Sequence, residues 1–170
     1  SSLYVLAGNL DEAERLVNQA LEAEPENTDA WFNRSIISGL SGDLEGQKTA
    51  LEEVLQIDPS NAAANASLGA LALQRGEVAQ ARSHFERAVE SDPTDVAAIS
   101  GLGRVLLEQE EYHEAEDQLS RAIELDPQYS FSYVDRAQAR ALQYKLPQAE
   151  EDLSTAIELE PNYAWNYVDR

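Results

Sequence analysis

The sequence predicts an all-α fold, a solenoid in which antiparallel helix pairs are stacked one after another. Five of its six prolines recur every 34 residues, at Pro25, Pro59, Pro93, Pro127 and Pro161. Between these prolines, apolar residues are spaced by three and four, the spacing of one helical face. A single globular core has no need of such regular punctuation, whereas a chain that stacks one small unit several times produces it.

Each recurrent proline follows an acidic residue: the pairs are Glu24-Pro25, Asp58-Pro59, Asp92-Pro93, Asp126-Pro127 and Glu160-Pro161. Proline has no amide hydrogen to donate, and it biases the preceding residue away from helical geometry. Each acid–proline pair therefore predicts a turn that follows the end of a helix.

Each unit is expected to hold two helices. In the third segment, a helical period at Leu68 and Leu71 is interrupted at Gly76 and resumes at Ala81 and Phe85. The first helices are expected at 29–41, 63–75, 97–109 and 131–143. The second helices are expected at 11–23, 45–57, 79–91, 113–125 and 147–159.

Small residues recur at fixed places in these helices. In the first helices they are Ser35, Gly69, Gly103 and Ala137; in the second helices they are Ala13, Ala81, Ala115 and Ala149, then Ala20, Ala88, Ala122 and Ala156. They allow paired helices to approach, while Val17, Leu51, Phe85, Leu119 and Leu153 fill the space beside them. The second unit has Gln47 and Val54 at the small positions, so we expect looser or wetter packing there.

These residues resemble the tetratricopeptide repeat family, whose 34-residue unit carries Trp, Leu-Gly, Tyr, Ala, Phe, Ala and Pro at set positions. The matching residues are Trp31, Leu68-Gly69, Leu102-Gly103, Ala81, Phe85, Ala88 and Pro93. The resemblance implies a right-handed superhelical solenoid that forms one array over 1–170. Its units would be a partial repeat 1–27, full repeats 28–61, 62–95, 96–129 and 130–163, and the start of a further repeat at 164–170.

Two departures from the pattern concern the turns between helices. Gly8, Gly42 and Gly76 occupy this turn in three units, but Glu110 and Tyr144 replace glycine in the others. Those two turns either lack a left-handed residue or carry a strained one. Pro147, the sixth proline, falls in the first turn of an expected second helix, where its missing donor costs nothing.

A third departure is a charged residue where the pattern expects leucine. Arg34, Arg136 and Arg170 occupy this position, which points toward the second helix. A charged group there needs a partner. Asp152 lies in the antiparallel helix, and we expect it to pair with Arg136 as a packing element and not as a binding site.

Composition excludes several function classes. The net charge is −20, from 32 acidic and 12 basic residues, which disfavours nucleic-acid binding. A solvated acidic surface, selection for a basic partner, and a salty habitat, suggested by the presence of only two lysines, Lys48 and Lys145, are all compatible with it. There is no cysteine and no run of 18 apolar residues, so we expect neither thiol-bound metal nor a membrane span. The sequence has no methionine and no signal peptide, which suggests excision from something longer, and its residues do not determine the compartment.

The residues also offer little for catalysis. His84 and His113 fall in different second helices without a serine or cysteine relay. The acidic run from Glu108 to Asp117 lacks the turn glycine of a calcium loop. We therefore expect no enzyme activity, no metal and no cofactor.

The resemblance implies instead a concave groove lined by the first helices. Carried onto this chain, the groove residues are Phe32, Asn33, Ile36, Ala66, Ser67, Ala70, Leu73, Gln74, Ser100, Arg104, Leu107, Phe131, Val134, Asp135, Gln138 and Leu142. In chaperone-binding relatives, lysines, arginines and asparagines of successive first helices hold a terminal carboxylate. Only Asn33 and Arg104 suit that role, so we expect no such clamp, with Arg104 as the one strong anion contact.

The leading functional hypothesis is a protein-interaction scaffold that holds a peptide or helical segment of a partner in this groove and supports complex assembly. A second hypothesis is self-assembly through the terminal helices, with Trp165 and Tyr167 exposed at one end. A third is that the array is the targeting arm of a larger protein or enzyme.

Overall fold

The computed structural model describes residues 10–161, and these form helices throughout. In chain order the helices are α2 (Leu10–Ala23), α3 (Thr28–Leu40), α4 (Leu44–Ile57), α5 (Ala62–Gln74), α6 (Val78–Ser91), α7 (Val96–Glu108), α8 (Tyr112–Leu125), α9 (Ser130–Leu142) and α10 (Leu146–Leu159). Each agrees with its expected range to within about one residue, because the acid–proline turns and the glycine positions mark the helix ends independently. The all-α prediction is confirmed.

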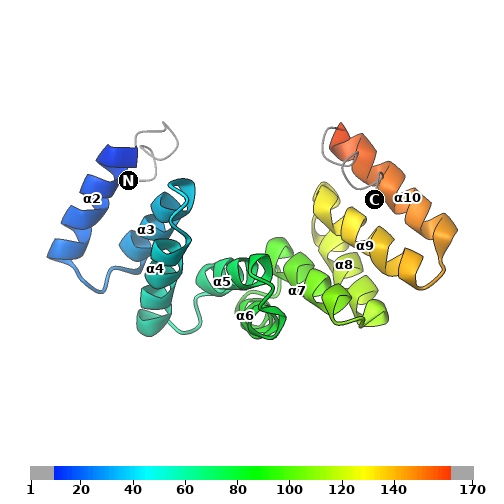
Figure 1. The fold of residues 1–170 in the computed structure, drawn as a ribbon, viewed down its shortest axis with the longest axis horizontal. Helices are drawn as coiled ribbons and strands as arrows, with labels where there is room; N and C mark the ends of the chain where they lie inside the picture. Colours follow the sequence, from blue (N-terminus) through cyan, green and yellow to red (C-terminus); the bar gives the residue numbers. More distant parts are fainter. Residues whose placement is uncertain (1–9, 162–170) are drawn as a thin grey trace.

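Successive helix pairs form an arch whose two ends rise to the same side (Figure 1). The first helices α5 and α7 run along the inner side of the arch, and α6 lies beneath α5 on the outer side. Helices α5 and α7 pack on each other, as do α7 and α9. The inner surface is therefore built from the first helices of successive units.

The core follows the expected alternation of small and large side chains. Ala81, Ala88, Ala115 and Ala122 are fully buried in the second helices. A Cβ atom added at Gly103 would lie 2.6 Å from the side chain of Leu119, so only glycine allows α7 and α8 to pack this closely.

The second unit accommodates its larger side chains. Val54 is fully buried. Gln47 lies against Gly39, where an added Cβ would come within 3.1 Å of the Gln47 amide. A glycine on the facing helix thus provides the space for Gln47.

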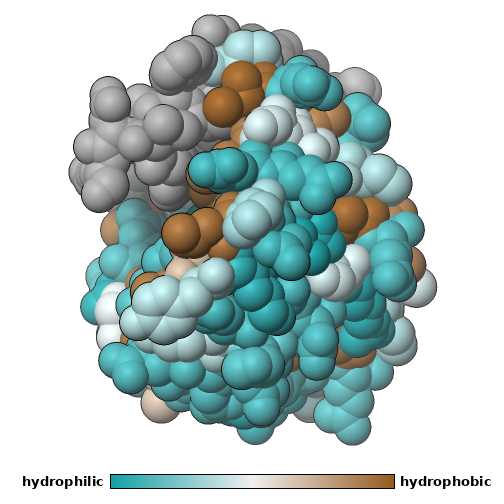
Figure 2. All heavy atoms as spheres, turned by 90° about the vertical axis from the view of Figure 1, so that its right-hand side faces the viewer, coloured by the Kyte–Doolittle hydropathy of each residue, from teal (hydrophilic) through white to brown (hydrophobic). Residues whose placement is uncertain are grey.

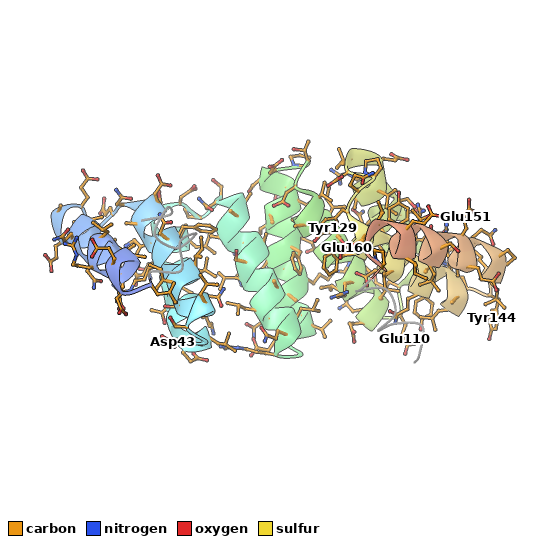
Figure 3. All side chains as sticks on the ribbon, turned by 90° about the horizontal axis from the view of Figure 1, so that it is seen from above. Asp43, Glu110, Tyr129, Tyr144, Glu151 and Glu160 are labelled. Atoms are coloured by element: carbon orange, nitrogen blue, oxygen red, sulfur yellow. The ribbon has the colours of Figure 1, made fainter. Side chains whose placement is uncertain are left out.

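Of the two alternatives for the turns without glycine, the structure shows the strained one. Gly42 and Gly76 have φ angles of 76° and 73°, and Glu110 and Tyr144 adopt the same left-handed conformation at 63° and 61°. Figure 3 shows Glu110 and Tyr144 along one edge of the array, the edge on which Asp43 also lies. Gly8 lies outside the described residues. Pro147 stands in the first turn of α10, as expected.

The acid–proline turns are closed by side chains of the following unit. Trp31 Nε1 donates to the Pro25 carbonyl at 2.8 Å, and Tyr133 Oη donates to the Pro127 carbonyl at 3.2 Å. The equivalent residue in the third full unit is Ile99, which has no donor to offer. There Arg121 of α8 donates to the Pro93 carbonyl instead, at 2.5 Å.

Candidate binding groove

A cavity of about 690 Å³ opens between α5, α7 and the start of α9. Its lining includes many of the predicted groove residues, namely Ala66, Ser67, Ala70, Leu73, Gln74, Ser100, Arg104, Phe131 and Asp135. Three separate first helices therefore contribute to one hollow, as the superhelical arrangement requires.

Short side chains make the cavity deep. Ala66 and Ala70 line it from α5, and Ala97 and Gly101 line it from α7. A Cβ atom added at Gly101 would stand 2.4 Å from the ring of Phe85. The missing side chain lets that ring, which α6 supplies from below, reach the cavity lining although it is only 3% exposed.

Aromatic side chains line the α9 end of the cavity. The rings of Tyr129 and Phe131 lie with centroids 5.4 Å apart in a tilted arrangement. Figure 3 shows Tyr129 between the middle helices and the C-terminal ones. Together with Phe85, these rings make the cavity predominantly apolar.

Sequence reasoning missed five lining residues: Phe85, Ala97, Gly101, Glu108 and Tyr129. Those on α7 follow one helical face, since Ala97, Gly101, Arg104 and Glu108 are separated by three or four residues. Extending that face from Arg104 in both directions would have found them. Phe85 was assigned only to the core, and Tyr129 precedes its helix.

Arg104, which the sequence predicts as the one strong anion contact of the groove, already pairs with Asp135. Its Nε and Nη2 donate to the two carboxylate oxygens of Asp135 at 3.1 and 2.9 Å. The Asp135 side chain is 6% exposed. Burial raises the pKa of Asp135, while the charge and hydrogen bonds of Arg104 work against that rise. The prediction treated the two residues separately and did not foresee that they neutralise each other.

Two predicted groove residues belong to the core instead. Leu107 and Val134 are 7% and 5% exposed and pack within hydrophobic clusters. Each lies on the side of its helix that faces its neighbours, one or two positions off the cavity face.

The remaining predicted residues lie away from this cavity. Phe32 packs against the core of the second unit, and Asn33 donates to the Asp29 carbonyl at 2.8 Å. Ile36, Gln138 and Leu142 are exposed on α3 and α9. The structure thus joins the α5, α7 and early α9 parts of the predicted groove and leaves its two ends separate.

Arg136 and Asp152 form the expected pair, within a larger polar network. Arg136 donates to Asp152 at 3.0 and 2.6 Å, and Arg140 donates to the same carboxylate at 2.9 Å. Arg136 also reaches Ser120 Oγ at 3.1 Å. The side chains of Arg136 and Asp152 are 14% and 3% exposed, which makes the pair a packing element. Arg34 pairs with Asn18 at 2.8 Å rather than with a carboxylate, and Arg170 lies outside the described residues.

Glu116 extends the network to α8. It accepts hydrogen bonds from Arg140, Gln143 and Lys145 at 2.9, 3.0 and 2.6 Å. Burial works to raise the pKa of Glu116, but these three donors outweigh it and lower the pKa to about 2. The carboxylate is therefore charged at neutral pH and joins α8 to the last helix pair.

The histidines have structural surroundings. His84 lies within 3.2 Å of the Oδ1 atom of the fully buried Asn65, whose amide donates to the carbonyls of Pro59 and Asn61. These two donations fix the Asn65 oxygen toward His84, so His84 Nδ1 is the donor. Burial lowers the pKa of His84, and the charge of Arg87 adds to this. His113 is exposed.

Within residues 10–161, the acidic run from Glu108 onward does not fold into a group that could hold a metal ion. Over the same residues, each helix is too short or too polar to cross a membrane.

Models of the tetratricopeptide repeat match the sequence over residues 2–62, 41–96 and 72–141. Among curated proteins, none matches it.

Several solved structures share the fold. One is YrrB, a TPR protein described as having an unusual peptide-binding site (21% identity, 99% of this chain, 88% of that chain, TM-score 0.77). Another is MamA residues 41 to the end from Desulfovibrio magneticus (21% identity, 95% and 92%, TM-score 0.80). A third is PilW, a type IV pilus biogenesis factor (22% identity, 93% and 73%, TM-score 0.81). At these identities the likeness establishes the fold alone.

Proposed function

Because the chain belongs to the tetratricopeptide repeat family, we propose that it captures a segment of a protein partner in the cavity between α5, α7 and the start of α9. Protein–protein interaction is the typical role of this family, whose members are generally non-enzymatic scaffolds. The chain would act by holding a partner in place and would carry out no chemistry of its own.

The observation that carries this proposal is the cavity itself. It has a volume of about 690 Å³, and its alanines, glycine and aromatic rings offer an apolar surface that water solvates poorly. Cavities of this kind receive hydrophobic anchors of an extended peptide or an amphipathic helix. The peptide-binding site described for YrrB is a precedent in a protein of similar fold.

A substitution that fills the cavity without adding charge tests the proposal. Ala70 is exposed on α5 and lines the cavity, so Ala70→Gln should occupy its space while the helix stays intact. Ala79 is exposed on α6 and lies outside the cavity, so Ala79→Gln is the matched control. Both variants and the wild type would be used as bait, and bound proteins would be quantified by mass spectrometry.

We expect the Ala70→Gln variant to lose a defined set of partners that the wild type and Ala79→Gln retain. If Ala70→Gln retains the partners that the wild type binds, the cavity is not the binding site.

Self-assembly and a targeting role remain predictions. The terminal residues on which self-assembly depended, Trp165 and Tyr167 among them, lie outside the described residues. In Figure 2, the α10 end of the array is mostly hydrophilic, with hydrophobic side chains in separate spots. Light scattering over a concentration series would detect self-assembly directly.

A further inference from the structure

We propose that the groove cavity selects a partner segment in which a bulky apolar side chain lies next to a lysine or arginine, and that it rejects acidic segments. This inference rests on the proposed function, since it specifies the chemistry of the segment that the cavity would hold. It follows from three properties of the lining: an apolar floor, an arginine that is already neutralised, and a surplus of carboxylates.

The apolar floor requires a bulky anchor. The ring of Phe85 lies beneath Gly101, and Ala70 and Ala97 flank it from the two first helices. Small residues surround the hollow and Tyr129 and Phe131 close one end, so a small partner side chain would leave much of it unfilled. Leucine, methionine or an aromatic residue would bury the most apolar surface.

The single arginine of the lining already has a carboxylate partner within the chain. Asp135 occupies Nε and Nη2 of Arg104 in a two-pronged arrangement, the geometry in which guanidinium and carboxylate match best. A partner carboxylate could take that side of Arg104 only by displacing Asp135. Because the Asp135 side chain is 6% exposed, displacement would leave a buried carboxylate without its counter-charge.

The remaining charges near the cavity are negative. Glu108 is exposed on the α7 side of the lining. At the α9 end, burial raises the pKa of Tyr129, and the charges of Asp135, Asp95 and Asp126 raise it further against the opposing effect of Arg104. Within the lining itself, the carboxylates of Asp135 and Glu108 stand against the one guanidinium of Arg104, which leaves one negative charge in excess beside the apolar hollow.

A basic residue beside the apolar anchor fits this surplus. The long stems of lysine and arginine can lie along an apolar wall while the charged head reaches a carboxylate at the rim. Tyr129 also offers an aromatic ring to a cation. The net charge of −20 over the whole chain would draw basic segments toward the groove and repel acidic ones.

Selection from a random library of displayed 12-residue peptides tests the inference without a known partner. The library would be selected in parallel on wild type, Ala70→Gln and Ala79→Gln. We expect wild type and Ala79→Gln to enrich peptides with an apolar residue within four positions of lysine or arginine, with few acidic residues. We expect this enrichment to disappear on Ala70→Gln.

The strongest peptide would then be compared with its Lys→Glu counterpart by fluorescence polarisation at low and high salt. We expect the exchange to weaken binding by at least about tenfold at low salt, and by less at high salt. Glu108→Gln and Asp135→Asn should each reduce the difference in affinity between the selected peptide and its Lys→Glu counterpart. Glu108 is exposed, so its variant tests the charge argument even if Asp135→Asn alters the fold.

The outcomes separate this inference from the proposed function. If acidic peptides are enriched and Ala70→Gln abolishes their binding, the cavity is a binding site but its preference is not the one inferred. If no peptide is enriched, or if Ala70→Gln binds the same peptides as the wild type, the proposed function itself fails.

Discussion

Replacing Asp152 with alanine should destabilise the last helix pair more than any change at a neighbouring acidic residue. Asp152 accepts three hydrogen bonds from two guanidinium groups, at 2.6, 2.9 and 3.0 Å, and its side chain is 3% exposed. Alanine would remove all three at once and leave two half-buried guanidinium groups without the carboxylate that they share.

The size of the destabilisation depends on the hydrogen bonds that Arg136 and Arg140 keep in the variant. Removing one member of a buried ion pair costs about 3–5 kcal/mol. Arg136 would keep its contact with Ser120 at 3.1 Å and Arg140 its contact with Glu116 at 2.9 Å. The lower end of the range, about 3 kcal/mol, therefore applies. For a chain of this size, each kcal/mol corresponds to a shift in melting temperature of about 2–4 °C, so we expect a shift of about 6–12 °C.

The assay should resolve the last unit from the rest, because units of a repeat array can unfold separately. Amide hydrogen exchange of α9 and α10 would be measured beside thermal unfolding followed by circular dichroism. Glu151→Ala is the matched control, since Glu151 is the adjacent residue and lies on the exposed side of α10 (Figure 3). If Asp152→Ala and Glu151→Ala melt within about 1 °C of each other and exchange alike, the network does not stabilise this unit and the reasoning is wrong.

Two other predictions concern stability. Tyr144 has a φ angle of 61° and is 91% exposed, so Tyr144→Gly should relieve the strain without loss of packing and stabilise the chain by about 1 kcal/mol in urea unfolding. Tyr144→Ala, which keeps a Cβ atom at the strained position, should give no such gain. The second prediction is that Glu116→Gln destabilises at pH 7 and that its difference from wild type shrinks in acid. The pKa of Glu116 is lowered from 4.5 to about 2, so its stabilising effect is complete above about pH 5 and is lost as the pH falls toward 2. Urea midpoints of both proteins that stay equally far apart from pH 7 to pH 2 would contradict this.

Much of the fold could be predicted because every unit restates the same local rules. The acid–proline turns and the period of three and four placed the helices. The replacement of glycine by Glu110 and Tyr144 left two alternatives, of which the structure shows the left-handed one, and the arginine at position 136 predicted its pairing with Asp152. What was missed in that network is Arg140, which also binds Asp152 but occupies a position with no equivalent charge in other units.

The groove was harder to predict because its contacts join residues at different positions of successive units. An alignment of units shows which residues share a register, and it assigns each residue a role within its own unit. Arg104 and Asp135 are separated by 31 residues and occupy different registers of successive units, so the alignment placed both in the groove without relating them. The turn at Pro93 is a second example. Ile99 cannot donate to the Pro93 carbonyl, and Arg121 of the second helix donates to it instead, a contact that an alignment of units does not show.

Such pairs bear on function as well as on prediction. A charged residue that departs from the repeat pattern is a candidate for binding only if no oppositely charged side chain of the array already neutralises it. Arg104 is the most prominent departure in the groove, yet Asp135 neutralises it. Glu108, which is exposed at the rim of the same cavity, is less conspicuous in the sequence because acidic residues are abundant throughout. The charge that a partner would meet beside the apolar hollow is therefore negative, and under the proposed function this combination would favour a basic, apolar segment.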